Sequence, residues 1–504
     1  MFRFIDDFLN HTTMYRLVVY YVGVLLALDF GLGLGGLSPH DPAQLTFSLA
    51  IICISSWVTN KALAALLRIP ANAESIWITA LIIAVIMAPV GSQDWAGMAG
   101  LAGASAVGIA SKFLLALNRK HIFNPVAVGV VFSAYVIDSP ATWWVGGSVY
   151  LLPAVLLGGL LILRKLQRFG MFAAYMVAQL LVIAMTSDPS QYSMLLNETF
   201  LSSPLLFLGF AMLTEPLTAP TGKWPALAFG ALVGVLSAPP LHIGDFYFSP
   251  ELALMVGNVL AWATNSKHRY RLVLQRIERT AAGCYDYVFQ SDRPLRHRPG
   301  QYIDWTMNVA KADSRGNRRT FTIASSPGER VVRLGVKFYP QPSAYKQAML
   351  NMRPGQVVYG AQLAGEFVLP DTEEKLAFIA GGIGITPFRS MVGHMLEEQD
   401  KRDVTLFYGN NSADEISYSE LFDAATDMLN FKTVYAVADS SASHGPFHRG
   451  FIDAALIARE MPDYMERVFY ISGPRKMVLS FQKILAELGV SRSKIRTDFF
   501  PGFA

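Results

Sequence analysis

Cysteine is scarce in this chain, and its scarcity excludes several kinds of redox protein. Only Cys53 and Cys284 occur among the 504 residues, and they fall in different halves of the sequence. A disulfide framework needs several cysteine pairs, and an iron–sulfur cluster is usually held by about four thiolates. We therefore expect neither a disulfide framework nor a cysteine-ligated cluster within the chain.

Histidine is missing where a membrane haem would need it. Axial ligation of a transmembrane haem requires paired histidines on facing helices. The histidines of the first half lie at the ends of apolar segments or in loops: His11, His40, His121 and His242. This placement disfavours a haem-bearing transmembrane reductase.

Charged residues make up only 16% of the chain, and they are unevenly distributed. Residues 1–266 hold eleven Lys plus Arg and twelve Asp plus Glu, which leaves 31 of the 42 basic and 26 of the 38 acidic residues to the second half. The first half is therefore membrane-like, and the second half has the composition of a soluble protein. The net charge of +4 points to no particular partner, and we expect no nucleic-acid partner.

The first half contains ten apolar segments of roughly membrane-spanning length, since ~20 residues cross a ~30 Å hydrocarbon core. They begin near Arg16, Leu45, Ser75, Ala96, Pro125, Val149, Phe169, Pro204, Pro225 and Glu251. The sequence thus predicts a polytopic, all-α domain in the lipid bilayer over residues 1–266. No signal peptide is expected, because acidic residues stand near the N-terminus and no small-residue cleavage site follows them.

The loops between these segments alternate in charge. Loops 37–43, 91–94, 138–147, 188–202 and 241–250 contain no Lys or Arg, whereas the opposite set carries the basic residues. By the positive-inside rule, both termini and the soluble half are predicted to be cytoplasmic, in a multi-pass membrane protein. Aromatic residues on the other side are predicted to form an interfacial belt: Trp95, Trp143, Trp144, Phe246, Tyr247 and Phe248.

Two stretches interrupt the apolar half with proline beside polar residues. Asn124-Pro125 opens the fifth segment, and a run from Thr214 to Thr221 interrupts the end of the eighth. Such stretches are typical of broken helices that line a cavity, and their positions suggest two inverted repeats of five segments. Loop ends at the cytoplasmic surface are equally consistent with them. For Asp29, at membrane depth, an ion path and a structural hydrogen bond are both open.

The second half is organised around one β-type stretch. Residues 318–327 read Arg-Arg-Thr-Phe-Thr-Ile-Ala-Ser-Ser-Pro, so that two guanidinium groups lead a strand which small hydroxyl residues close. Such a strand can bind an anion through Arg319 while its hydroxyls and amides meet a flat, hydrogen-bonding ring. We therefore expect an anionic, ring-bearing ligand here.

Further along, a glycine-rich turn follows a buried strand. The apolar run 377–380 leads into Gly-Gly-Ile-Gly-Ile-Thr-Pro at 381–387. Glycines let the backbone approach a pyrophosphate, Thr386 can cap the next helix, Pro387 suits its first turn, and the helix N-terminus favours negative charge. A later strand, 468–471, leads into Ser-Gly-Pro-Arg-Lys-Met at 472–477, and an aromatic stretch containing Phe503 ends the chain.

In this order and spacing, the motifs resemble those of the ferredoxin-NADP reductase superfamily, from about residue 268 to the end. The family pattern is Arg-x-Tyr/Phe-Ser/Thr, Gly-Gly-x-Gly-x-Thr-Pro, Cys-Gly-Pro-x-x-Met and a terminal aromatic residue. The resemblance implies an FAD-binding β-barrel at 268–370 and an α/β domain that binds NADH or NADPH at 371–504. The chain departs from the pattern at Phe321, where the family has Tyr, and at Ser472, where it has Cys.

The resemblance also implies roles for individual residues. Arg319 would hold the FAD pyrophosphate, Phe321 would lie along the flavin, and Thr322 would hydrogen-bond near its N5. The other implied flavin contacts are Gln301, Tyr302, Ser325 and Ser343. The implied nucleotide contacts are Gly381, Gly382, Gly384, Thr386, Gly473, Pro474 and Met477. Ser472 would lie beside the hydride path, and Phe503 would stack on the isoalloxazine until the nicotinamide displaces it.

The first half resembles the membrane subunits shared by the Rnf complex and the sodium-pumping NADH:quinone reductase, RnfD and NqrB. Those proteins have a similar Asn-Pro opening and a Thr-Asp-Pro-x-Thr-x-Pro stretch. The resemblance implies flavin contacts at Asn124, Thr214, Glu215 and Thr218. The family's Ser/Thr-Gly-Ala-Thr motif for covalent FMN is missing, because residues 139–142 read Ser-Pro-Ala-Thr. A noncovalent second flavin, FMN or riboflavin, is therefore expected.

These observations predict a membrane-bound flavin oxidoreductase that passes electrons from NAD(P)H through FAD to a flavin or quinone in the membrane half. Two alternatives stay open: a transporter that couples electron flow to Na⁺ or H⁺ movement, and a reductase that its helices anchor beside a monooxygenase or desaturase. Asn410, Asn411 and Ser412, where NADPH enzymes usually place arginine, favour NADH, although Arg475 or Lys476 would suit the extra phosphate of NADPH. No metal site is predicted.

Overall fold

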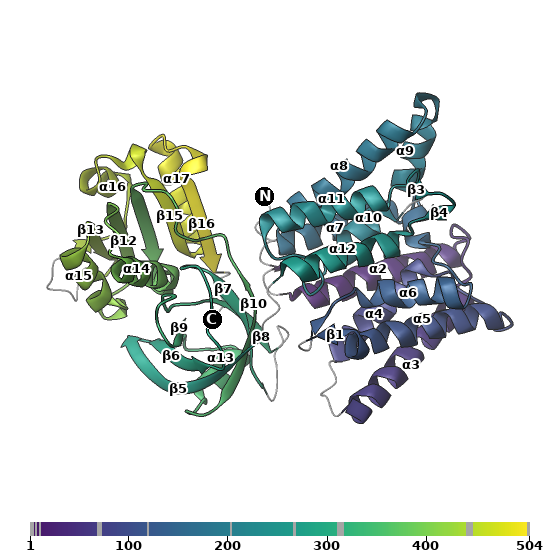
Figure 1. Cartoon of the computed structure of the whole chain (residues 1–504), viewed down its shortest axis with the longest axis horizontal. Helices are drawn as coiled ribbons and strands as arrows, with labels where there is room; N and C mark the ends of the chain where they lie inside the picture. Colours follow the sequence, from purple (N-terminus) through teal and green to yellow (C-terminus); the bar gives the residue numbers. More distant parts are fainter. Residues whose placement is uncertain are drawn as a thin grey trace. The chain divides into compact units, whose positions relative to one another are not determined.

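The computed structural model describes residues 5, 8–9, 12–67, 73–117, 120–201, 204–265, 269–309, 317–439 and 447–500. The chain divides into two compact units, Met1–Lys267 and His268–Ala504. The first unit is mainly helical, and the second contains the two six-stranded sheets (Figure 1). Each unit is described by itself.

The helices of the first unit pack into one bundle with a continuous apolar core. They are α2 (Met14–Leu34), α3 (Pro42–Leu67), α4 (Ala73–Ile86), α5 (Trp95–Leu114), α6 (Pro125–Val136), α7 (Leu152–Leu166), α8 (Phe169–Thr186), α9 (Tyr192–Leu201), α10 (Leu205–Phe207), α11 (Lys223–Leu236) and α12 (Pro250–Thr264). A short π-helix, η3 (Leu208–Met212), continues α10.

Four described helices are long and apolar enough to cross a membrane: α2, α3, α5 and α8. A fifth span would be counted if the bent pair 189–201 and 205–212 is one crossing. The apolar helices α4, α6 and α11 are shorter, and the 12 residues of α6 rise about 18 Å at 1.5 Å each. The prediction of ten spanning segments therefore stays a prediction, because several apolar segments fold as short helices joined by turns.

Glycine allows the closest helix contacts in both halves of this unit. A Cβ atom at Gly129 of α6 would lie 2.1 Å from the Ala104 carbonyl oxygen of α5. A Cβ atom at Gly234 of α11 would lie 2.2 Å from the Tyr175 carbonyl oxygen of α8. Small residues at helix interfaces are typical of membrane bundles, where close packing replaces the hydrophobic driving force.

The predicted aromatic belt is wrong for two of its six members. Trp143 and Trp144 are only 5% and 8% exposed. The Trp143 indole donates to Glu251 Oε1 (2.7 Å), and the Trp144 indole donates to the Met87 carbonyl (3.0 Å). Buried indoles find such partners because an unpaired N–H is costly. Trp95 is 78% exposed.

The second unit begins with a six-stranded antiparallel sheet in the order β8-β7-β10-β5-β6-β9. Its strands are β5 (Tyr270–Ala281), β6 (Cys284–Ser291), β7 (Tyr302–Thr306), β8 (Arg318–Thr322), β9 (Val332–Lys337) and β10 (Val357–Ala364), with helix α13 (Ala344–Leu350) beside them. Alternating apolar side chains form its core around the fully buried Trp305. The order leaves β8 and β9 at the edges of the described sheet, so closure into a barrel stays a prediction.

The remainder forms a parallel six-stranded sheet in the order β14-β13-β12-β11-β15-β16. Its strands are β11 (Leu376–Gly381), β12 (Val404–Asn410), β13 (Phe431–Val437), β14 (His448–Arg449), β15 (Val468–Pro474) and β16 (Ile495–Phe500). The helices are α14 (Thr386–Glu398), α15 (Ser419–Met428), α16 (Ala454–Glu460) and α17 (Arg475–Glu487).

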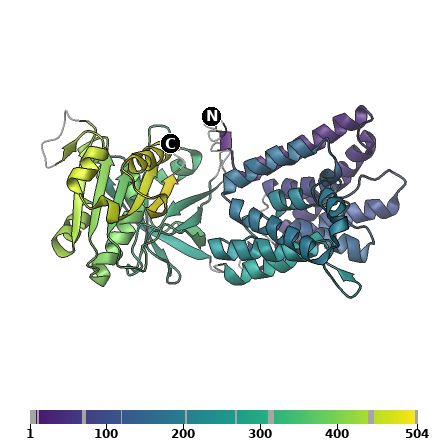
Figure 2. The same ribbon diagram turned by 90° about the horizontal axis from the view of Figure 1, so that it is seen from above.

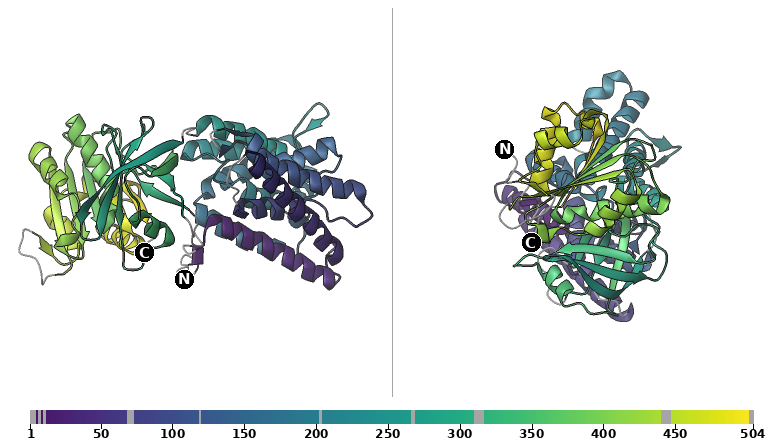
Figure 3. Two further views of the ribbon diagram at one scale, coloured as in Figure 1. Left: turned by 90° about the horizontal axis from the view of Figure 1, so that it is seen from below. Right: turned by 90° about the vertical axis from the view of Figure 1, so that its left-hand side faces the viewer.

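Two apolar cores cover the two faces of the parallel sheet. Phe378 of β11 packs with residues of α14 and α15, whereas Ile379 packs with residues of α16 and α17. Figures 2 and 3 show helices on both sides of these strands. A parallel sheet is buried on both faces in this way, which explains the uninterrupted apolar run at 376–380. The expected α/β architecture is thus present.

Candidate functional site

The strand order of the parallel sheet places the glycine-rich turn at its switch point. From β11 the chain winds outward to β12, β13 and β14, and then returns to β15 on the other side of β11. Ala380 at the end of β11 pairs with Ser472 of β15, so the Gly-Gly turn and the Ser-Gly-Pro turn lie next to each other. Ligands of such sheets bind outside the carboxyl ends of the strands at this point.

Close packing explains Gly384 in these turns, and backbone conformation explains Gly382. A Cβ atom at Gly384 would lie 2.5 Å from the Ser472 carbonyl oxygen and 2.6 Å from the Gly473 Cα. Gly382 has φ +52°, a conformation that favours glycine. The turn itself is a 3₁₀ segment, Gly382–Ile385, that leads directly into α14.

The sequence prediction for Thr386 was partly wrong. Thr386 is the first residue of α14, and no side chain caps this helix. Its hydroxyl donates instead to the Ile383 carbonyl (3.1 Å), so it fastens the glycine turn to the helix. Pro387 lies in the first turn of α14, as predicted, because proline there gives up no helical hydrogen bond.

A cavity of about 480 Å³ opens at this edge of the sheet. The glycines 381, 382 and 384 line it together with Pro474 and Met477, which the sequence had assigned to the nucleotide site. Lys476, which the sequence analysis considered for the NADPH phosphate, lines it as well. Residues that the sequence reasoning missed also line it, among them Lys337, Glu415 and Phe451. Lys337 and Glu415 form an ion pair across 2.8 Å. The volume, the glycine turn and the helix N-terminus suit a dinucleotide.

Ser472 lies behind this cavity rather than on its surface. Its side chain is fully buried, and within the described residues no hydrogen-bond partner reaches its hydroxyl. Gly473 follows it in β15, against the Gly381 backbone. The predicted aromatic contact, Phe503, lies outside the described residues.

The arginine-led strand is β8, and it meets α13. The Arg319 guanidinium lies 5.1 Å from the centre of the Tyr345 ring, and the Phe321 ring lies 6.1 Å from the same ring. Tyr345 is in the first turn of α13, and Ser343 caps that helix by accepting from Lys346 N (3.3 Å). Arg319 thus lies near the start of α13, where its guanidinium is placed to bind a phosphate.

The other predicted flavin contacts gather at the end of β8. Thr322 is 4% exposed and pairs with Tyr302 of β7, while the Gln301 carbonyl accepts from Ile323 N (3.0 Å). The Ser325 hydroxyl is turned inward and accepts from Arg333 N (3.2 Å). The structure therefore brings Gln301, Tyr302 and Thr322 together. The Ser325 hydroxyl instead connects the segment after β8 to the backbone of β9.

In the helical unit, three of the four predicted contacts form one polar cluster. Glu215 accepts from Asn124 Nδ2 (2.9 Å) and from the Thr218 hydroxyl (3.0 Å). Two residues that the prediction missed complete it: His121, whose Nε2 lies 3.3 Å from Glu215, and Asn258, which accepts from Asn124 N (2.8 Å). In the sequence, the position of His121 at a segment end served only to argue against haem ligation. Its carboxylate partner, Glu215, lies 94 residues away, and no sequence pattern connects the two.

The fourth predicted contact, Thr214, lies outside this cluster. Its hydroxyl donates back to the Phe210 carbonyl (2.6 Å), one turn earlier. Asn258 lies near the middle of α12 and donates to the Thr218 carbonyl (3.2 Å). The 214–219 turn therefore packs against the middle of that helix rather than against its end. This contact favours the broken-helix interpretation over a loop end.

The cluster encloses little space. A cavity of about 30 Å³ adjoins Asn124 and Glu215, roughly the volume of one water molecule. The polar groups satisfy one another, and the cavity is too small for an isoalloxazine ring. A flavin role for Asn124, Thr214, Glu215 and Thr218 therefore stays a prediction.

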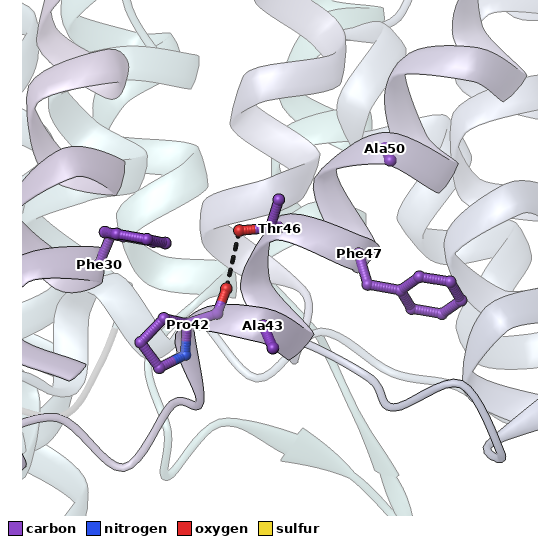
Figure 4. Close-up of a pocket in the computed structure, with 6 residues that line it drawn as sticks. All are labelled: Phe30, Pro42, Ala43, Thr46, Phe47 and Ala50. Atoms are coloured by element: carbon purple, nitrogen blue, oxygen red, sulfur yellow. Dashed lines mark hydrogen bonds between the residues drawn. The ribbon is translucent and has the colours of Figure 1, made fainter. Parts of the chain in front are cut away.

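Asp29 forms a separate polar cluster. It is 1% exposed, and it accepts from the Ser38 hydroxyl (2.8 Å) and lies 3.0 Å from His40 Nδ1. These contacts favour the structural interpretation of Asp29, since the carboxylate fastens the turn after α2. Nearby, Phe30 of α2 and five residues of α3 line an open groove of about 480 Å³ (Figure 4). None of these six side chains is charged, so the groove offers no group for a nucleotide phosphate.

Comparison with known proteins agrees with the geometry of the parallel sheet. Residues 378–483 match the family model described as the oxidoreductase NAD-binding domain. The F subunit of the Na⁺-translocating NADH-quinone reductase of Neisseria meningitidis is 31% identical over 201 residues, which is 36% of this chain and 49% of that protein. The same component of the reductase of Methylococcus capsulatus is 28% identical over 200 residues, with the same shares. The chain thus spans about half the length of these relatives.

Among solved structures, the flavohem-like FAD/NAD-binding domain of nitric oxide dioxygenase from Vibrio cholerae is similar, with a TM-score of 0.42 and 22% identity. The match covers 46% of this chain and 98% of that chain. The family match, the switch point and the glycine-lined cavity define the class of the second unit: it carries the NAD-binding domain of an oxidoreductase.

Proposed function

We propose that this protein is an NAD(P)H-dependent flavoprotein oxidoreductase that passes electrons to an acceptor in its membrane unit. The observation that carries the proposal is the cavity at the switch point, lined by the glycine turn in a domain that matches the oxidoreductase NAD-binding model. The name of the curated relatives, components of an NADH-quinone reductase, supports NADH as the substrate and a quinone as an acceptor.

For FAD, the chain's own residues suggest a binding site on the antiparallel sheet. Arg319 would bind the pyrophosphate together with the start of α13, where Ser343 fixes the first turn. Phe321, Thr322, Gln301 and Tyr302 would border the ring. When bound, FAD supplies the exchange between two-electron hydride chemistry and one-electron transfer. The domain bounds 268–370 and 371–504 belong to this proposal.

For the membrane unit, we propose the architecture and orientation that the sequence predicts. It would resemble the membrane subunits RnfD and NqrB, with two five-helix repeats, cytoplasmic termini and a location in the bacterial inner membrane. The close glycine contacts between α5 and α6 and between α8 and α11 support a membrane location, because such packing is typical of membrane bundles. A second flavin or a quinone would bind elsewhere than in the 30 Å³ cavity beside Glu215.

The proposal is tested by flavin analysis and turnover of the detergent-purified full-length protein. We expect one FAD per chain, a second flavin that is FMN or riboflavin, and NADH-dependent reduction of a short-chain quinone. FAD as the sole flavin, reduced by NADH but not reoxidised by quinone, would support the anchored reductase instead. NADH-dependent Na⁺ or H⁺ uptake into proteoliposomes would support the transporter.

We also expect Glu415 to favour NADH over NADPH. Its carboxylate lines the cavity and would repel a 2′-phosphate, while it engages the Lys337 ammonium that could otherwise bind one. Glu415→Gln should therefore raise kcat/KM for NADPH relative to NADH by about tenfold, equivalent to ~1.4 kcal/mol. The matched control is Asp414→Asn, at an exposed position next to Glu415. Equal ratios in both variants would contradict a selective role for Glu415.

A further inference from the structure

The nucleotide-binding helix α14 is attached to the chain just after β8. Arg389 Nη1 donates to the Ala324 carbonyl (2.9 Å), and the Ser390 hydroxyl donates to the Ser325 carbonyl (2.7 Å). Arg389 also pairs with Glu329 of the turn before β9. These contacts hold Arg389 and Ser390, where the first turn of the helix passes into the second, whereas the glycine turn precedes its first residue. The first residue of α14 has further contacts of its own.

The start of α14 packs on β9 at a glycine. A Cβ atom at Gly335 would lie 2.6 Å from Thr386 Cγ2 and 2.5 Å from the Tyr418 hydroxyl oxygen. Gly335 therefore marks the place where β9, the first residue of α14 and the residue before α15 meet. Thr386 in turn fastens the glycine turn through its bond to the Ile383 carbonyl.

A buried hydrogen bond closes this junction. The Tyr418 hydroxyl donates to Asp286 Oδ1, and Asp286 is 1% exposed on β6, directly opposite Gly335. Arg333 Nη1 lies 3.4 Å from the other carboxylate oxygen, and Arg389 lies 5.9 Å from the centre of the Tyr418 ring. Burial raises the pKa of Asp286, and Tyr418 and the two arginines act against this rise. The carboxylate is thus held by a few defined partners.

The backbone of Tyr418 supports a special role for this residue. It has φ +63°, the left-handed conformation that residues with a Cβ seldom adopt. Such a conformation persists only where surrounding contacts enforce it, and it is common at functional sites. Here the left-handed backbone of Tyr418 directs its phenol toward the antiparallel sheet, where the hydroxyl donates a hydrogen bond to Asp286.

We propose that the Tyr418–Asp286 hydrogen bond is a positioning contact for hydride transfer, which fixes the start of α14 and its glycine turn against the flavin-binding sheet. The inference rests on the proposed function, because it concerns the distance between a nicotinamide on the glycine turn and a flavin at the end of β8. Hydride transfer depends steeply on this distance, since a displacement of about 1 Å can cost roughly 100-fold in rate. Tyr418 and Asp286 act through Thr386 and need touch neither ligand.

The test is flavin reduction by NADH in single turnovers of the full-length, FAD-loaded protein. Tyr418→Phe should lower the limiting rate constant about tenfold while the Kd for NADH changes less than about twofold. Amide hydrogen exchange over residues 383–390, measured without NADH, should become faster. Tyr435→Phe is the matched control, because Tyr435 of β13 also donates to a carboxylate, that of Asp423 in α15 (3.4 Å), within the same domain. It should leave both readouts unchanged.

A second variant separates positioning from folding. Tyr418→Phe leaves the Asp286 carboxylate with poorer pairing, which by itself could destabilise the domain. In the double variant Tyr418→Phe with Asp286→Asn, the neutral amide removes that cost, and the rate constant should stay low while the melting temperature recovers. A wild-type rate in either variant, or a loss confined to NADH affinity, overturns the inference. A wild-type protein that NADH does not reduce would instead refute the proposed function.

Discussion

Arg319→Ala is expected to release FAD from the purified full-length protein. The guanidinium lies near the start of α13, and no other cation among the proposed flavin contacts could replace its charge-assisted bonds to a pyrophosphate. Losing such bonds should weaken FAD binding about 100-fold, or ~2.7 kcal/mol. The FAD content after gel filtration should fall below about a tenth of the wild-type value, as measured by absorbance and chromatography of the extracted flavin.

Arg318→Ala is the matched control for this prediction. Arg318 precedes Arg319 on β8, so its side chain points to the opposite face of the strand, 3.7 Å from Asp304. It should keep its FAD. If Arg319→Ala also keeps FAD with wild-type affinity, the proposed pyrophosphate site is wrong. If the proposed second flavin exists, FMN or riboflavin should stay with Arg319→Ala when FAD is lost.

Gly384→Ala is expected to abolish reduction by NADH while FAD stays bound. The new Cβ atom would lie 2.5 Å from the Ser472 carbonyl oxygen, a backbone atom that no side-chain rotation can move away. The glycine turn must therefore shift outward into the cavity that would receive the nucleotide. We expect kcat/KM for NADH to fall at least about 100-fold, because a turn displaced by about 1 Å loses both binding and alignment.

Gly409→Ala provides the contrast for this prediction. Gly409 is the next-to-last residue of β12 and lines the same cavity, but a Cβ atom there would meet Ile452 Cδ1 at 3.4 Å, an ordinary contact. It should change kcat/KM for NADH by less than about threefold. Wild-type turnover of Gly384→Ala would mean that the glycine turn does not form the nucleotide site. Loss of FAD or of the folded state would be seen in the flavin spectrum and the melting curve.

The nucleotide half of the site could be predicted from the sequence because its determinants are local. An apolar run of strand length, a glycine turn and a helix start follow one another at 376–398, and each has its own backbone requirement. The same holds for β8, because side chains alternate between the two faces of a strand and this alternation sets the directions of Arg319 and Thr322. Thr386 escaped the prediction because a cap depends on backbone angles that the residue type does not fix.

The membrane half shows the limit of such reasoning. Asn124 and Glu215 are 91 residues apart, and the sequence suggested only that both belong to broken segments. His121, just before α6, and Asn258 of α12 join them through tertiary packing, and the cavity beside this cluster has a volume of about 30 Å³. Likewise, Trp143 and Trp144 fitted a lipid interface by position, but buried acceptors inside the bundle bind their indoles.

By itself, the sequence determined that an apolar half precedes a more polar one, and that the polar half carries a glycine turn typical of dinucleotide sites. Composition and short motifs suffice for this because they express backbone and solvation preferences of neighbouring residues. Only the tertiary structure decided which distant polar groups meet: Glu215 with Asn124 and His121, and Asp286 with Tyr418. Such contacts depend on the packing of elements far apart in the chain, and each buried polar group takes the partner that this packing brings within hydrogen-bond distance.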